Sequence, residues 1–119
     1  MNFQSAYSGL INIYATLIEE KSDRGIDFQD DFLRSEKIAT ALLSINHNSK
    51  GCFLNRAKQR MLFAESLRLE DKDPLSMIKL GLDDISRLEN IGKADGNLLY
   101  LKSTIYRISA MYELNKGLS

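Results

Sequence analysis

The sequence is poor in the residues on which metal, disulfide and nucleophilic chemistry most often depend. Its 119 residues include one cysteine, Cys52, one histidine, His47, and one proline, Pro74. A single cysteine excludes an intramolecular disulfide framework and a Cys-rich zinc site, and it is typical of a protein in a reducing compartment. We therefore expect a fold without disulfides or structural zinc.

An excess of charge of either sign is also lacking. Sixteen Lys and Arg residues face sixteen Asp and Glu residues, so the chain as a whole is neither a polybasic nucleic-acid binder nor an acidic mimic. With 44% hydrophobic and 27% charged residues, the composition is that of an ordinary folded protein. The length predicts one domain over residues 1–119 and excludes a multidomain enzyme.

No segment has the pattern of a targeting or membrane element. Residues 1–4 lack the positive charges of a signal peptide, and the most apolar stretch, 10–18, is interrupted by Asn12 and Thr16. We therefore expect a cytoplasmic protein that does not contact a membrane.

Several catalytic motifs are missing as well. There is no Gly-rich phosphate loop and no Gly-x-Ser-x-Gly turn. A carboxylate-bridged di-metal bundle needs Glu-x-x-His pairs, but Ser44 stands three residues before His47. The Asp pairs at 30–31 and 83–84 are adjacent in sequence, so the two carboxylates of each pair point to different parts of a helix surface. We expect no autonomous catalytic site, no metal and no cofactor.

What the sequence does have is apolar residues at helical spacing nearly throughout. The first stripe predicts a helix over 3–21, and further stripes begin at Phe28, Leu54, Leu75 and Leu98. No alternation typical of a strand extends over six residues. The pattern predicts an all-α, antiparallel helical bundle of four to five helices. The number depends on whether residues 46–51 form a turn or continue a helix.

Two helix boundaries have clear local signals. Asp73 can cap a helix whose first residue is Pro74, since a proline there loses no intrahelical hydrogen bond. Gly25 can take the left-handed conformation that favours a helix end, and Asp27 or Asp30 can cap the next start. An internal repeat of the tetratricopeptide type is not indicated, because aligning the Leu-Gly at 80–81 with that motif puts Asp84 where an aromatic residue belongs.

Charge is unevenly distributed along the chain. Residues 1–31 carry two basic and six acidic side chains, residues 32–69 carry seven and two, and residues 70–119 carry seven and eight. This pattern predicts either a solvated helix face or a docking surface for a charged protein partner. The candidate docking residues are Arg56, Lys58 and Arg60 in the basic segment and Asp30 and Asp31 in the acidic one. Nucleic acid is not expected as a partner, since the aromatic residues of the basic segment fit the core.

The one constellation that suits a group transfer is His47-x-x-Lys50-Gly51. On a helix, Lys50 would share a face with His47 and place an ammonium group beside the imidazole. A neutral imidazole is a competent nucleophile for a phosphoryl group, and the lysine would neutralise charge on the phosphoryl oxygens. Gly51 would leave room for a partner to approach.

This motif resembles the signature of the histidine phosphotransfer (HPt) domains of bacterial phosphorelays, which are also all-α. The resemblance implies that His47 accepts a phosphoryl group from a receiver aspartate, that Lys50 assists and that Gly51 gives access. The partner would be a receiver domain or a kinase. Asn46 and Ser49 depart from the small or apolar residues of the family at those positions.

Two hypotheses follow for the function. If 46–51 is helical, the chain is a phosphorelay carrier. If the segment is a turn, as its richness in Asn, Ser and Gly favours, His47 is a solvated loop residue. The chain is then a non-catalytic helical binding module, such as a secretion chaperone, a toxin-neutralising immunity protein or a regulator, that masks a surface of its partner.

Overall fold

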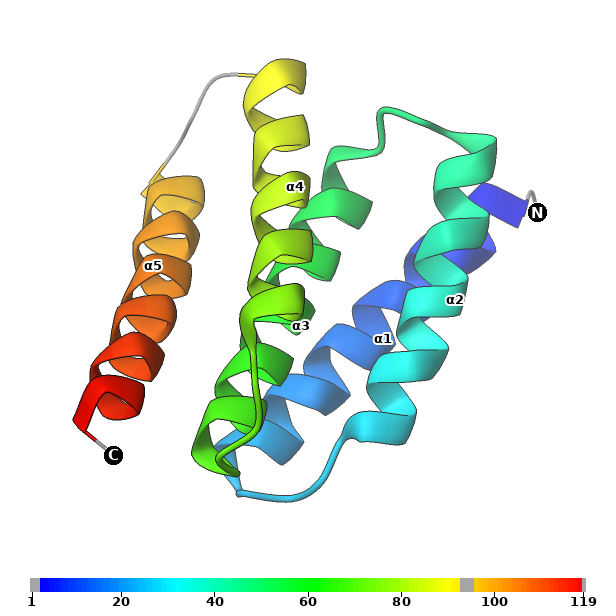
Figure 1. The fold of residues 1–119 in the computed structure, drawn as a ribbon. Coiled ribbons are helices and arrows are strands. Elements are labelled where there is room, and N and C mark those ends of the chain that lie inside the picture. The colour runs from blue at the N-terminus through cyan, green and yellow to red at the C-terminus, as the bar shows by residue number, and fades with distance from the viewer. Residues whose placement is uncertain (1–2, 93–95, 119) are drawn as a thin grey trace.

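Five α-helices make up the fold (Figure 1). The computed structural model describes residues 3–92 and 96–118, and within these ranges it contains no strand. The helices are α1 (Phe3–Asp23), α2 (Gln29–Ile45), α3 (Lys50–Leu69), α4 (Leu75–Ile91) and α5 (Gly96–Leu118). The predicted all-α bundle is confirmed. Residues 46–49 lie between two helices, so the five-helix alternative is the observed one.

Short polar side chains set the starts of three helices. The Asp27 carboxylate accepts a hydrogen bond from the backbone N–H of Gln29 at 3.0 Å, and the Asp73 carboxylate accepts one from Leu75 at 2.8 Å. The hydroxyl of Ser49 caps α3. Each bond satisfies a backbone donor that has no intrahelical acceptor. Gly25 has a φ of 69°, the left-handed conformation predicted for it.

The helices form a structural repeat that the sequence did not reveal. In Figure 1, α1, α3 and α5 run in one direction and α2 and α4 in the other. From the start of α1 to the start of α3 is 47 residues (3 to 50), and from the start of α2 to that of α4 is 46 (29 to 75). The chain is therefore two helical hairpins of equal size, followed by α5 in the position of the first helix of a third. Stacked hairpins of this length are the building plan of α-solenoids.

The central helix is α3. Its backbone lies close to those of all four other helices, whereas within the described ranges the backbones of α1 and α5 are not close to each other, nor are those of α2 and α4. Apolar side chains of α3 pack with those of α4 and α5 in the largest cluster of the core, which contains Phe53, Ala57, Ala64, Ile78, Ile85, Leu88, Leu98, Leu101, Ile105 and Ile108. Two smaller clusters join α3 to α1 and α2, and one of them includes a stacked pair, Phe32 and Phe63, with ring centroids 4.4 Å apart.

An ion-pair network fills the space between α2 and α4. The guanidinium of Arg60, which is 7% exposed, donates to both carboxylate oxygens of Glu36 on α2, at 2.9 and 2.8 Å. It also donates to Asp84 on α4 at 3.0 Å. Arg56 donates to both oxygens of Asp84, which is 1% exposed, at distances of 2.6 to 3.1 Å. Three helices are thus joined through two arginines of α3.

The acidic partners of Arg60 favour the protonated form of its guanidinium. Burial by itself lowers the pKa of the guanidinium, but the hydrogen bonds with Glu36 and the charge of Asp84 outweigh it and hold the pKa above its usual value. Arg60 also donates to the backbone carbonyl of Leu80 at 3.2 Å. The network is therefore well hydrogen-bonded, as a buried ion pair must be.

Removing the charge of Asp84, the carboxylate that both arginines contact, should destabilise the fold strongly. We expect Asp84→Asn to lower the free energy of unfolding by about 3–5 kcal/mol, because Arg56 loses its counter-charge and Arg60 keeps only that of Glu36. The neighbouring Asp83, which is exposed, is the matched control, and Asp83→Asn should change stability by less than about 0.5 kcal/mol. Denaturation in urea measures both. Equal effects of the two variants would contradict the structural role of the network.

Candidate functional site

His47 lies in a turn and not on a helix. The turn begins at Asn46, whose side-chain oxygen accepts from the backbone N–H of Asn48 at 3.1 Å and whose backbone oxygen accepts from Ser49 at 3.4 Å. Ser49 then caps α3. His47 is exposed. The polar residues at 46 and 49 are thus used to end one helix and start the next, which is the alternative that their composition favoured.

Lys50 and Gly51 are the first two residues of α3. The ammonium of Lys50 lies against Gly92 at the end of α4, and a Cβ at position 92 would collide with it. A cation there is stabilised by the partial negative charge of the helix C-terminus. Gly51 is exposed and borders open space. The helical spacing that would bring the His47 imidazole and the Lys50 ammonium onto one face is absent.

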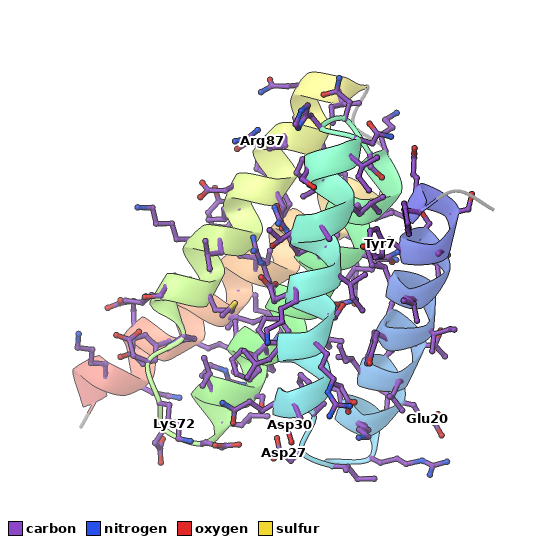
Figure 2. All side chains as sticks on the ribbon, turned by 90° about the vertical axis from the view of Figure 1, so that its right-hand side faces the viewer. Tyr7, Glu20, Asp27, Asp30, Lys72 and Arg87 are labelled. Carbon is purple, nitrogen blue, oxygen red and sulfur yellow. The ribbon has the colours of Figure 1, made fainter. Side chains whose placement is uncertain are left out.

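The five predicted docking residues do not form one surface. Arg56 and Arg60 belong to the network with Asp84, and Asp31 is buried and paired with Lys21 at 2.5 Å. Lys58 and Asp30 are exposed. Figure 2 places Asp30 beside Asp27, where α2 begins.

Cys52 is a packing residue. It is buried with Ile11, Ala39 and Leu42, and its Sγ lies 3.7 Å from the backbone oxygen of Ala39. Burial raises the pKa of the thiol from its usual 9.0 to about 11, although the nearby Arg56 acts in the opposite direction. The thiol is therefore neutral and unreactive near pH 7.

A groove that the sequence did not indicate runs between α1 and α5, with α3 as its floor. Its volume is about 650 Å³, within the range of ligand-binding pockets. Its lining is rich in side-chain amides and charged groups and consists of Asn12, Ala15, Thr16, Glu19, Asp23, Asn55, Lys58, Gln59, Met61, Leu62, Asn97, Tyr100 and Leu101. The groove exists because α1 and α5 both contact α3 but not each other.

Two smaller hollows meet at His47, with volumes of about 320 and 440 Å³. Arg87 lines both, and Figure 2 shows it near the C-terminal end of α4. Asp83 and Asp84 share the smaller hollow with the arginines. Because the charges of the smaller hollow are mixed, it offers no concentrated field of one sign to a phosphoryl group, and in the larger hollow Arg87 is the one Lys or Arg of the lining.

The outer side of α5 is a second feature that the sequence analysis missed. Its inner side is buried, but the apolar side chains of the outer side are exposed, and they are Leu99, Tyr106, Met111 and Leu114. The sequence did contain a signal for this exposed apolar side, because apolar residues occur on both sides of the predicted last helix. A helix that is apolar all round is usually covered on all sides.

Residues 3–92 and 96–118 hold no group of three or more His, Cys, Asp or Glu side chains arranged for a metal ion. Within the same ranges, no helix has the length and apolar character needed to cross a membrane.

The position of Cys52 predicts slow labelling of the native chain by a thiol reagent. At pH 9, about half of an exposed thiol is ionised but only about one in a hundred of the Cys52 thiols. We expect labelling by dithionitrobenzoate to be limited by unfolding, whereas Ser86→Cys, at an exposed position of α4, should react at once. Because the thiol ionises near 9.0 when unfolded and near 11 when folded, the free energy of unfolding should fall as the pH rises above 9. Equally rapid labelling of Cys52 would contradict its burial.

The phosphorelay hypothesis stays a prediction, now without its helical geometry. A His47 in a turn should take up no acid-labile phosphate from a panel of phosphorylated receiver domains, beyond that of His47→Gln. His47→Gln should also leave the free energy of unfolding within about 0.5 kcal/mol of the wild type, since the side chain is exposed. Uptake of phosphate that depends on both His47 and Lys50 would restore the relay.

Comparison with known proteins adds no further constraint. No family model matches the chain, and neither a curated protein nor a solved structure does. A function is therefore inferred from the geometry and chemistry of this chain alone.

Proposed function

We propose that this protein is a non-catalytic helical module that binds another protein through the outer side of α5. This is the second of the two hypotheses drawn from the sequence, with the contact moved to a different surface. A secretion chaperone, an immunity protein and a regulator all act in this way, by covering a surface of the partner.

The observation that carries the proposal is the exposure of large apolar side chains along one side of α5. Leu99, Tyr106 and Leu114 are 60%, 54% and 63% exposed. The intervals of seven and eight residues place them within one sector of the helix. Isolated exposed apolar residues need no explanation, but several large ones in one sector of the same helix point to an interaction surface.

The residue types along this row fit a protein interface. Tyr106 and Arg107 are of the kinds that contribute most to binding energy at protein interfaces. Arg107 lies with its guanidinium 3.5 Å from the sulfur of Met111, so the charged side chain extends along the apolar surface. The row thus combines apolar area with groups that give orientation.

The repeat of the fold gives a physical reason for this surface. Each earlier helix of the same direction, α1 and α3, packs against a following antiparallel helix and against the next helix of its own direction. Within the described ranges α5 has α3 and α4 on its inner side and no helix on its outer side. A helix of another protein could pack there with the geometry that the hairpins use among themselves.

A photocrosslinker placed on this surface tests the proposal. We expect a benzophenone amino acid at Tyr106 to give a discrete crosslinked product with another protein in cells that express the chain. The same group at Ser86, exposed on α4, should not give that product. Adding Leu99→Asp to the Tyr106 probe should reduce its yield at least tenfold, because a carboxylate is buried without a partner. The absence of a product from position 106, or equal products from 106 and 86, would overturn the proposal.

A further inference from the structure

The groove between α1 and α5 is lined by the chemistry that a peptide backbone needs. Four side-chain amides, Asn12, Asn55, Gln59 and Asn97, line it together with the hydroxyl of Thr16. Every amide side chain carries both a hydrogen-bond donor and an acceptor, as does every peptide unit. A row of such groups can pair with successive backbone units of an extended chain.

Two of these amides are already oriented by each other. Asn55 donates from Nδ2 to Oδ1 of Asn12 at 2.9 Å, across the gap between α3 and α1. This bond fixes both side chains and still leaves the Asn12 NH2 group and the Asn55 carbonyl oxygen for a ligand. The pair therefore offers both a hydrogen-bond donor and an acceptor to a ligand in the groove.

Gln59 on the floor of the groove has a buried polar atom without a partner. It is 2% exposed; its Oε1 accepts a hydrogen bond from the hydroxyl of Ser35, and no described residue pairs with Nε2. If the amide group were flipped, the Ser35 hydroxyl would accept a hydrogen bond from Nε2, because a hydroxyl can both donate and accept. The Oε1 atom would then have no donor. In either orientation one polar atom of this buried amide has no partner among the described residues, and because that atom is itself buried, it is not open to a ligand in the groove.

The charges at one end of the groove favour a basic side chain. Glu19 and Asp23 lie four residues apart on α1, so both carboxylates lie on the groove side of that helix. Both are exposed, and neither is among the ion pairs of the described residues. Like charges at this spacing repel, and a cation between them relieves the repulsion.

An extended segment fits these groups better than a helix does. The backbone amides of a helix are bonded within the helix, so a helix in this groove could not use the row of side-chain amides. A helix would instead need an apolar floor. Here the floor combines Asn55, Lys58 and Gln59 with two apolar residues.

We infer that the α1–α3–α5 groove binds an extended segment of the partner protein, whose backbone pairs with Asn12 and Asn55 and whose Lys or Arg side chain lies between Glu19 and Asp23. The inference rests on the proposed function and adds the chemistry of the partner segment. It uses a different surface from the outer side of α5, so the two can fail separately.

A positional library of capped nonapeptides tests the groove in the full chain. Each position in turn is held as Lys, Arg, Leu or Glu, and binding is followed by fluorescence anisotropy. We expect one position at which Lys or Arg binds at least tenfold more tightly than Glu. The double variant Glu19→Gln, Asp23→Asn should abolish this preference. Glu20→Gln, whose parent residue pairs with Arg24 outside the groove, is the matched control and should retain it.

The contribution of the backbone is tested with the best peptide of that library. We expect Asn55→Ala to weaken its binding at least tenfold and Asn115→Ala, an exposed amide near the end of α5, to have no effect. N-methylation of the peptide backbone beside the basic residue should weaken binding to a similar degree. The inference is overturned if no peptide binds, if the basic preference survives the double variant, or if N-methylated peptides bind as well as the parent. If the Tyr106 crosslink forms in any of these cases, the proposed function stands and only the groove is lost.

Discussion

The arrangement of the helices depends on the position of one guanidinium. The backbones of α2 and α4 do not approach each other closely in the described structure, and Arg60 of α3 lies between Glu36 of one and Asp84 of the other. Because a buried charge is costly unless it is paired and hydrogen-bonded, this arginine tolerates only those positions of the two helices that supply both carboxylates. The network therefore defines where the second hairpin lies on the first. It also explains the basic middle segment, since two of its charges are neutralised inside the protein.

The fold class and several boundaries could be predicted because they depend on local physics. Apolar spacing identified the helices, and the Asp73–Pro74 and Gly25 signals act within a few residues of the chain. The burial of Arg60 could not be predicted in this way. Its partners stand 24 residues away on either side, and nothing in the spacing of Glu36, Arg60 and Asp84 distinguishes a buried network from a solvated helix face. A charge pattern in a sequence gives the sign of the groups and not their depth.

The repeat escaped detection for a related reason. Stacked hairpins conserve the lengths of helices and loops, whereas each helix has different neighbours. α3, which contacts four helices, has fully buried small residues at Ala57 and Ala64, and α1, at the edge, has Ile11 and Ile18 in its buried positions. A central helix needs small side chains to let its neighbours approach, and an edge helix needs large ones to cover the core. The same geometry is therefore built from different residues, and a search for a residue motif fails.

The same stacking produces both surfaces to which a function is assigned. Two helices that pack on a common third one, without contacting each other, leave a groove over it, and a helix at the edge of the array leaves one side uncovered. The groups that could do covalent chemistry are placed otherwise. The Cys52 thiol is buried with a raised pKa, His47 lies in an exposed turn, and Asp84 and Glu36 are neutralised by arginines. Two kinds of group remain on these surfaces: amides that can hydrogen-bond with the backbone of a partner, and apolar side chains that can pack against it. Such groups serve recognition, because they hold a partner without making or breaking its covalent bonds.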